Sequence, residues 1–437
     1  MNAQFVSTMP QKRATTHAYI NARRIGAVTQ PWRCAAEAVP GIDMVKDIAG
    51  LALLAHISFG AFATALLSLA PAAPAHAGGL RTAAPPPIRH VFLVVLENKS
   101  FETAFGRDSS APYLAKTLPA RGALLTQYYG IGHWSLDNYI ALVSGQAPNP
   151  ATQHDCLRPT EFQLSSPGLD AHGQALGSGC VYPAIVRTLP DQLEHAGFTW
   201  KGYMEDLDRN PTRDDPQTCT AGRIGKNDET ERASVGDQYA ARHNPFLYFH
   251  TILDNPVRCA AHIVRLNELR IDLDRIGTTP NYSLITPNLC NDGHDARCVD
   301  GKTGGLASIN EFLRKWVPVI TGSPAFHKDG LLIITFDESD GVAPDAFDAC
   351  CYEKPLLHSN RPGLKGPGGG RIGAVLLSPY IRPHTVSGVP YNHYSLLRTV
   401  ENIFGVGHLG YAGEPGLHTF GADVFTRAER PFGRTAD

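Results

Sequence analysis

Two nearly uninterrupted apolar runs, each ending directly in acidic or amide residues, constrain this chain more than any other feature. The runs are HVFLVVL at 90–96, followed by Glu97 and Asn98, and LLIITF at 331–336, followed by Asp337 and Glu338. Runs of Val, Leu and Ile without polar alternation are typical of sheet strands that are covered on both faces. Because open parallel sheets bind ligands outside the carboxyl ends of their strands, we expect both polar pairs to converge on one hard cation, such as Mg²⁺, Ca²⁺ or Mn²⁺. The alternative is two unrelated loop acids.

The remaining chain alternates β-like and helical stretches, which predicts an α/β fold. Further strands are expected at 198–203, 282–286 and 372–377, and helices at 136–144, 188–196, 308–320 and 392–404. Residues 145–180 and 339–371 are rich in Gly, Pro and Ser and are expected to form long loops. We therefore predict one large domain at 89–437, preceded by a stiff Pro-rich linker at 78–88.

Residues 1–77 have the composition of an export segment. A positively charged stretch precedes 23 uncharged residues at 48–70, and Ala75-His76-Ala77 resembles a small-x-small cleavage site. This order is typical of a secretory signal, and a start at Met44 gives a signal of ordinary length. An uncleaved anchor is the alternative, because 23 residues are long enough to span a bilayer. Both a cleaved signal and an uncleaved anchor leave the domain outside the cytoplasm, so we expect a secreted or periplasmic protein.

Charge and cysteine content support this division. Residues 1–77 contain six of the 39 basic and three of the 41 acidic residues, so the remainder has a formal charge of −5. That balance excludes a nucleic-acid partner bound through a basic surface. Removing the leader also leaves eight cysteines, which permit four disulfides in an oxidising compartment. Cys290–Cys298 is a plausible short loop, whereas the adjacent Cys350 and Cys351 are expected to have separate partners.

The segment GIGHWSLDNYIALVSGQ at 130–146 contains a predicted helix start. Ser135 can cap a helix that begins at Leu136. Alternatively, because a helix amino terminus binds anions, Ser135 is placed to attack a phosphorus held there, flanked by His133 and Asn138. A serine nucleophile needs a neighbouring base or metal, which the two acidic strand ends could supply.

A third polar cluster lies in NLCNDGHDARC at 288–298. Asp292, His294 and Asp295 at this spacing can bind a second metal or place a general acid beside a leaving group. The alternative is a loop held by Asx turns. His393, at the start of the last predicted helix, is a further candidate, although a lone histidine is more often structural.

Taken together, these segments resemble the phosphoesterase family of the alkaline-phosphatase superfamily. The matching blocks are ENKSF at 97–101, HWSLDNYIALVSG at 133–145, GYMEDL at 202–207, HNPFLYF at 243–249, NDGHD at 291–295, FDESDG at 336–341 and NHYSLLRTVENIFG at 392–405. They occur in family order. The family holds bacterial acid phosphatases and phospholipases C, and the chain resembles the short secreted acid phosphatases, which include phosphatidylinositol 3-phosphate phosphatases.

The resemblance implies a three-layer α/β/α sandwich like that of alkaline phosphatases, and a covalent phosphoenzyme. Ser135 matches the nucleophile, and Asn138 matches an asparagine that follows it. Metal ligands are implied at Glu97, Asn98, Asp337 and Glu338, and positions around the phosphate or a second metal at His133, Asp292, His294 and His393. The chain departs from the family pattern in having Lys99 where Arg is frequent, Trp134 where Pro is frequent, and Glu102 where phospholipases often carry Asp.

We therefore expect a metal-dependent acid phosphatase that hydrolyses phosphate monoesters through a phosphoserine, with phosphoinositides among the candidate substrates. The divalent metal is left open among Mg, Ca, Mn and Zn. The alternative within the family is a phospholipase C or another phosphodiesterase. A non-catalytic secreted protein that binds metal or phosphate is a third reading. With the leader cleaved, no permanent membrane span is expected.

Overall fold

The computed structural model describes residues 85–211, 213–214, 224–351, 353 and 368–426. The predicted leader at 1–77 and most of the predicted linker at 78–88 lie outside the described residues. Within the described part of the chain, no helix combines the length and the apolar character needed to cross a membrane.

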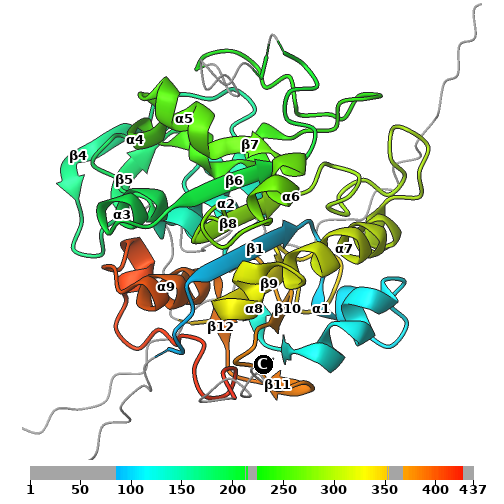
Figure 1. Ribbon diagram of the computed structural model, residues 1–437. Helices are drawn as coiled ribbons and strands as arrows, with labels where there is room; N and C mark the ends of the chain where they lie inside the picture. Colours follow the sequence, from blue (N-terminus) through cyan, green and yellow to red (C-terminus); the bar gives the residue numbers. More distant parts are fainter. Residues whose placement is uncertain (1–84, 212, 215–223, 352, 354–367, 427–437) are drawn as a thin grey trace, which may run out of the picture. The chain divides into compact units, whose positions relative to one another are not determined.

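An eight-stranded sheet forms the centre of the domain (Figure 1). Its strands run in the order β11 (Thr385–Ser387), β2 (Ala123–Leu125), β10 (Ala374–Leu377), β9 (Gly330–Phe336), β1 (His90–Leu96), β8 (Tyr282–Thr286), β6 (Trp200–Met204) and β7 (Ile263–Arg265). β1 is parallel to both of its neighbours, whereas β10 is antiparallel to β9 and β2. β1, β8 and β9 are buried along their whole length, as the unbroken apolar runs predicted.

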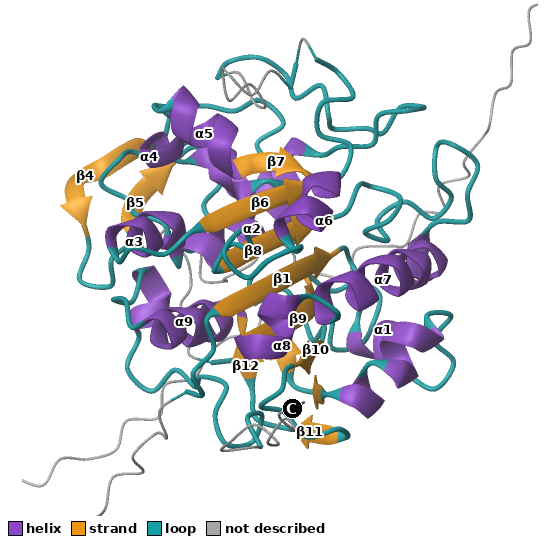
Figure 2. Ribbon diagram, in the orientation of Figure 1, coloured by secondary structure: helices purple, strands orange, loops and turns teal. Residues whose placement is uncertain are grey.

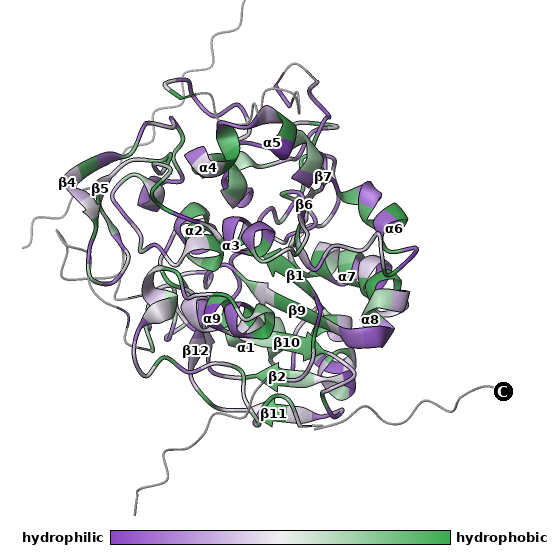
Figure 3. Cartoon of the chain, turned by 60° about the vertical axis from the view of Figure 1, so that its left-hand side comes forward, coloured by the Kyte–Doolittle hydropathy of each residue, from purple (hydrophilic) through white to green (hydrophobic). Residues whose placement is uncertain are grey.

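Helices cover both faces of this sheet, which gives the expected three-layer α/β/α architecture (Figures 2 and 3). The helices are α1 (Phe101–Phe105), α2 (Ser135–Ser144), α3 (Leu189–His195), α4 (His250–Leu253), α5 (Pro256–His262), α6 (Leu269–Asp272), α7 (Gly305–Thr321), α8 (Pro324–Asp329) and α9 (His393–Phe404). In Figure 3, α2, α3 and α9 lie on one side of the sheet and α6, α7 and α8 on the other, with the apolar strands β1 and β10 between them.

The five predicted strands correspond to β1, β6, β8, β9 and β10, and the four predicted helices to α2, α3, α7 and α9. The prediction of a long loop at 145–180 is wrong, because β4 (Gln163–Leu169) and β5 (Ala175–Ser178) pair there as an antiparallel ribbon. Most residues of this ribbon are exposed, so it has no apolar face that would mark it as a strand pair. A second small sheet pairs β3 (Tyr128–Tyr129) with β12 (Tyr391–Asn392).

Three disulfides join described cysteines, namely Cys156–Cys180, Cys290–Cys298 and Cys350–Cys351. The expected Cys290–Cys298 loop is confirmed. The expectation that Cys350 and Cys351 have separate partners is wrong, because the two bond to each other. A turn at Cys351, with φ of 64°, brings the adjacent side chains together. Cys259 is also disulfide-bonded.

Candidate active site

The two acidic strand ends meet at one edge of the sheet. β1 and β9 pair in parallel register with Leu96 opposite Phe336, so the next residues, Glu97 and Asp337, leave the sheet side by side. The Asn98 backbone N–H donates to Asp337 Oδ1 (3.0 Å), and its side-chain amide donates to Glu338 Oε1 (2.7 Å). The structure therefore brings Glu97, Asn98, Asp337 and Glu338 together at this edge of the sheet. That they bind a cation stays a prediction.

Ser135 projects from the start of α2 into this convergence. The helix begins at Ser135 itself, one residue earlier than predicted, and the residue before it, Trp134, has φ of 87°. The Ser135 hydroxyl donates to Glu97 Oε2 (2.7 Å). Asp155 Oδ1 accepts from the Leu136 N–H instead (2.9 Å). The capping role for Ser135 is therefore wrong, and its hydroxyl faces the acids.

A histidine joins the acidic cluster from a different part of the chain. His243 lies with Nε2 3.3 Å from Glu97 Oε1 and Nδ1 3.3 Å from Asp292 Oδ2. The Tyr139 hydroxyl donates to Glu97 Oε1 (2.8 Å), and the Tyr139 ring stacks on the His243 ring. Glu97, His243 and Asp292 are buried, and each presents one ligand atom within 4.8 Å of the others.

Burial and mutual repulsion set the protonation of this cluster. Burial, then the charges of Asp337 and Asp292, raise the pKa of Glu97 well above its ordinary value. Burial also raises the pKa of Asp337, and that of Asp292 to about 8. The pKa of His243 is lowered well below its ordinary value by burial and by Arg242. Buried acids this close repel one another unless a proton or a cation intervenes.

Several buried polar atoms of the cluster have no hydrogen-bond partner among the described residues. They are Asn98 Oδ1, Asp292 Oδ2, Asp337 Oδ2 and both ring nitrogens of His243. Buried polar atoms are almost always satisfied in folded proteins, so this group of oxygen and imidazole atoms requires an explanation. Carboxylate, amide and imidazole groups are suitable ligands for a divalent cation. The residues present therefore fit the predicted metal.

The cluster opens into a cavity of about 370 Å³, whose walls include Ser135, Glu338, His133, His294, Arg242 and Trp134. The guanidinium of Arg242 is buried in the wall, with Nε 3.7 Å from Asp155 Oδ2. One terminal nitrogen donates to the carbonyl oxygens of Thr230 (3.5 Å) and Glu231 (3.3 Å). A buried cation thus faces the same cavity as the Ser135 hydroxyl.

His133 and His294, the two predicted site histidines that line the cavity, differ in how many of their ring nitrogens are engaged. His133 donates from Nε2 to the Ala346 carbonyl oxygen (2.8 Å), and its Nδ1 lies against Glu338 Oε2, so both ring nitrogens are engaged. His294 is partly exposed, and its Nδ1 bonds Asp295 Oδ1 (2.9 Å). That bond is the main reason why the pKa of His294 is raised. His294 is therefore the better placed of the two to release a proton into the cavity.

Two other predicted residues are buried behind the cavity and brace its walls. Asn138 accepts from the Ile131 N–H (2.7 Å) and donates to the Gly132 and Trp134 carbonyl oxygens (3.0 Å each), so its amide holds the loop before Ser135. His393 donates from Nε2 to the Asp337 carbonyl oxygen (2.6 Å) and accepts from Tyr128 (3.1 Å). Neither side chain lines the cavity.

Lys99 also braces the site. Its ammonium donates to the carbonyl oxygens of Asn98 and Gly293 (2.9 Å each), which ties the loop after β1 to the loop that carries Asp292. The departure from Arg at this position therefore falls on a contact between two loops.

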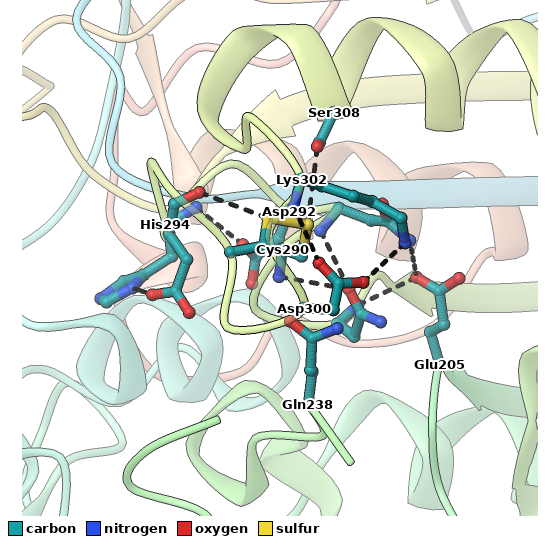
Figure 4. Close-up of a disulfide and its surroundings, with 12 residues drawn as sticks. Glu205, Gln238, Cys290, Asp292, His294, Asp300, Lys302 and Ser308 are labelled. Carbon is teal, nitrogen blue, oxygen red and sulfur yellow. Dashed lines mark hydrogen bonds and ion pairs between the residues drawn. A yellow bond between two sulfur atoms is a disulfide. The ribbon is translucent and has the colours of Figure 1, made fainter. Parts of the chain in front are cut away.

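A disulfide closes the loop that brings Asp292 and His294 to the site (Figure 4). The bridge between Cys290 and Cys298 lies next to Ser308 of α7, with Cys290 Sγ 3.5 Å from Ser308 Oγ. Within the loop, the His294 N–H donates to Asp292 Oδ1 (2.7 Å), and the Glu97 N–H donates to the Asp292 carbonyl oxygen (2.9 Å). These bonds hold the loop against the end of β1.

Sequence reasoning missed Arg242 and His243, which come from one short 3₁₀ turn, Ala241–His243. Consecutive residues there face different regions, Arg242 the cavity and His243 the acidic cluster. Asp155 and Tyr139 were also missed. The one sequence signal for His243 was the block HNPFLYF at 243–249. It contributed to the family resemblance, but no catalytic or metal-binding role was predicted for its residues.

Sequence comparison supplies the family. The sequence model of the phosphoesterase family matches residues 108–407. The chain belongs to that family. A phosphatidylinositol-3-phosphatase from Mycobacterium tuberculosis is 26% identical over 76% of this chain and 83% of its own length.

Two fungal relatives are similar over most of this chain but are longer. A probable acid phosphatase from Kluyveromyces lactis is 25% identical over 74% of this chain, and an acid phosphatase from Aspergillus fumigatus is 27% identical over 73%. The chain spans 59% and 55% of their lengths. Among solved structures, a Vibrio parahaemolyticus protein of the alkaline phosphatase superfamily has a TM-score of 0.44 at 12% identity, over 76% of this chain and 71% of that one.

Proposed function

We propose that this protein hydrolyses phosphate monoesters through a phosphoserine formed on Ser135. The observation that carries the proposal is the Ser135 hydroxyl, which starts α2, donates to Glu97 at 2.7 Å and lies in the wall of a cavity that also contains the buried Arg242. A nucleophile, a proton acceptor and an anion-binding helix start thus meet at one point.

The phosphoryl group is bound by this chain's own cationic and N–H groups. Arg242 lines the cavity, and a guanidinium can bond two phosphoryl oxygens at once. The amino terminus of α2 adds its partial positive charge. Asn138 positions the backbone of 131–134 and so keeps Ser135 in line with the bound phosphorus.

A divalent cation is part of the proposal. Glu97, Asn98 and Asp337 would hold it, with Glu338, Asp292 and His243 beside them as further ligands. When bound, such an ion supplies positive charge that lowers the pKa of the Ser135 hydroxyl and neutralises a phosphoryl oxygen. The raised pKa values of Glu97 and Asp337 support this assignment, because a cation would relieve the repulsion between them.

The reaction proceeds in two displacements. The Ser135 oxygen forms a bond to phosphorus while its proton passes to Glu97 Oε2, and the bond from phosphorus to the alcohol oxygen breaks. His294 gives a proton to the departing alkoxide. Water then attacks phosphorus while His294 accepts its proton in the reverse role. The bond from phosphorus to the Ser135 oxygen breaks, Glu97 returns its proton to that oxygen, and inorganic phosphate leaves. His133 holds Glu338 in place.

The proposed substrates come from the similarity to known enzymes, and the proposed secretion comes from the sequence of the leader. The similarity to a phosphatidylinositol-3-phosphatase makes phosphoinositide headgroups candidate substrates. Phospholipase C A from M. tuberculosis, 24% identical over 57% of this chain, keeps diesters as the alternative. Secretion rests on the leader sequence at 1–77, and amino-terminal sequencing of the protein released from its host would test cleavage after Ala77.

One experiment tests the reaction class. Purified protein is stripped with a chelator, reconstituted with Mg, Ca, Mn or Zn singly, and assayed on p-nitrophenyl phosphate and on p-nitrophenylphosphorylcholine. We expect turnover of the monoester with at least one metal and a much lower rate on the diester. Preference for the diester would favour the phospholipase alternative, and no turnover of either would favour a binding protein.

A further inference from the structure

Trp134, the residue immediately before Ser135, has an unusual backbone and an unusual position. Its φ of 87° lies in the left-handed region that side chains other than glycine rarely adopt. The peptide is held there by two bonds, from the Trp134 N–H to Glu338 Oε1 (3.0 Å) and from Asn138 Nδ2 to the Trp134 carbonyl oxygen (3.0 Å). Strained residues that are fixed in this way tend to occur at functional sites.

The indole is not buried in the core. Trp134 is 36% exposed, whereas the largest buried aromatic side chains of the protein are below 2%. It forms part of the cavity wall, next to Ser135 and near Leu157. The His154 ring lies 5.9 Å from it, centroid to centroid, on the turn that leads to Asp155. The strained backbone therefore presents a large, flat, partly exposed apolar surface in the wall of the cavity.

The position of this surface relates it to the leaving group. In the proposed reaction the phosphoryl group lies between Ser135 and Arg242, which both line the cavity, and the group esterified to it extends past Trp134, which is part of the same wall and 36% exposed. An aromatic ring stacks favourably on an indole, whereas a small polar alcohol gains little from it. Other walls near the mouth, such as Arg232 and Glu231, are charged.

On the basis of the proposed phosphatase activity, we propose that Trp134 is a specificity-determining residue whose indole stacks on the leaving group, so that phosphate monoesters of aromatic alcohols are preferred over those of alkyl alcohols, phosphoinositides included. Trp134 does not take part in bond making. Its contribution is to hold the ring of the leaving group while Ser135 reacts.

Two substitutions separate the ring from the backbone. Trp134→Gly removes the indole and accepts φ of 87° without strain, so the loop before Ser135 is retained. Trp134→Phe keeps an aromatic surface. Both variants and the wild type are assayed on O-phosphotyrosine and O-phosphoserine, which share an amino acid backbone and differ in the aromatic ring. Inhibition by inorganic phosphate and the thermal melting temperature are measured in parallel.

We expect Trp134→Gly to lower kcat/KM for phosphotyrosine about five- to tenfold, mainly through KM, as expected for the loss of one aromatic stacking contact. Phosphoserine turnover should change less than twofold, and Trp134→Phe should retain most of the phosphotyrosine activity. Inhibition by inorganic phosphate should be unchanged in both variants.

Equal losses on the two substrates, or no loss on phosphotyrosine, would overturn the proposal. Failure of the proposed function has a different signature, because the wild type would then turn over neither substrate. A variant that loses phosphate inhibition or melts at a much lower temperature would indicate a structural role for Trp134 and would also overturn the proposal.

Discussion

Glu97 and Glu401 are both fully buried, and they differ in what surrounds them. Glu97 lies among Asp337, Asp292 and His243, and it accepts from the Ser135 hydroxyl. Glu401 lies alone on α9, where Oε1 accepts from the Leu409 N–H (2.8 Å) and Oε2 has no hydrogen-bond partner among the described residues. Burial raises the pKa of Glu401 to about 9; the Leu409 N–H and the charge of Arg398 oppose this rise, and no acid contributes to it. A lone buried acid is satisfied by a proton, whereas a cluster of acids favours a cation.

The largest effect should come from the nucleophile of the cluster. Replacing Ser135 by Ala removes the group that attacks phosphorus, and we expect kcat/KM for p-nitrophenyl phosphate to fall at least ~1000-fold. Glu401→Gln is the matched control, since it alters an equally buried side chain outside the cavity, and should stay within threefold of the wild type. Equal turnover by wild type and Ser135→Ala would refute the nucleophile assignment.

Metal removal tests the cluster as a cation site. A divalent metal at about 100 times its Kd should stabilise the wild type and Glu401→Gln by ~3 kcal/mol. Asp337→Asn should lose most of this gain, while its metal-free form should be at least as stable as the metal-free wild type because one repulsive charge is gone. Thermal melts with and without chelator measure both quantities. Unchanged metal stabilisation of Asp337→Asn would contradict the assignment.

Substitution of His294, an exposed residue of the cavity wall, should affect activity differently from substitution within the buried acidic cluster. If His294 protonates the leaving group, His294→Ala should lower kcat/KM about 100-fold for an alkyl substrate such as glycerol 2-phosphate. The same variant should lose only a few-fold on p-nitrophenyl phosphate, whose leaving group departs without a proton. A uniform loss on both substrates would assign His294 to binding or to loop structure.

Two disulfides of the protein differ in what they enclose. Cys290–Cys298 closes the loop that carries Asp292, whereas Cys350–Cys351 joins adjacent residues. Cys290→Ser with Cys298→Ser should cost about 2–3 kcal/mol of stability, because it frees a short loop in the unfolded chain, and should weaken metal affinity through Asp292. Cys350→Ser with Cys351→Ser should cost much less, since adjacent residues enclose almost no chain. Denaturant unfolding and metal titration report the two quantities. The idea fails if the two double variants behave alike.

The smallest expected effect is the pH dependence of Glu401. Its folded-state pKa of about 9 exceeds the unfolded value of ~4.5, so the folded state keeps a proton that the unfolded state releases. The stabilisation is fully present below pH ~4.5 and is lost as pH rises towards 9. From pH 7 to pH 8, the wild type should lose ~1 kcal/mol relative to Glu401→Gln. The free energy of unfolding is measured against pH for both proteins. Parallel curves would show that Glu401 is ionised in the folded protein.

The predictable part of the site comes from local patterns. The apolar runs identified β1 and β9, and the residues that follow them were expected to converge. The structure places Glu97 and Asp337 side by side because the strands are parallel neighbours in register. Ser135 was also found, although the helix start was predicted one residue late. The positive φ of Trp134 places the helix start at Ser135. Hydrophobic periodicity does not reveal a backbone angle of this kind.

The unpredicted part depends on long-range contacts. His243 is distant in sequence from both Glu97 and Asp292, and only the packing of its 3₁₀ turn against α2 brings its ring between them. Asn138 and His393 have side-chain types suited to phosphate or metal, yet their amide and ring are used by backbone groups of neighbouring loops. No local pattern distinguishes these outcomes, because each depends on where a side chain points after the chain has folded.

Local patterns along the chain were enough to predict the sheet, the acids at its edge, the serine at a helix start and the family. These follow from buried apolar runs and from residues adjacent to them along the chain, which a strand or a helix end places without reference to distant segments. Packing between distant segments sets which of the histidines face the cavity, that Arg242 supplies its buried cation, and that Cys350 bonds Cys351. Those depend on the directions of side chains across packed elements, which only the folded chain specifies.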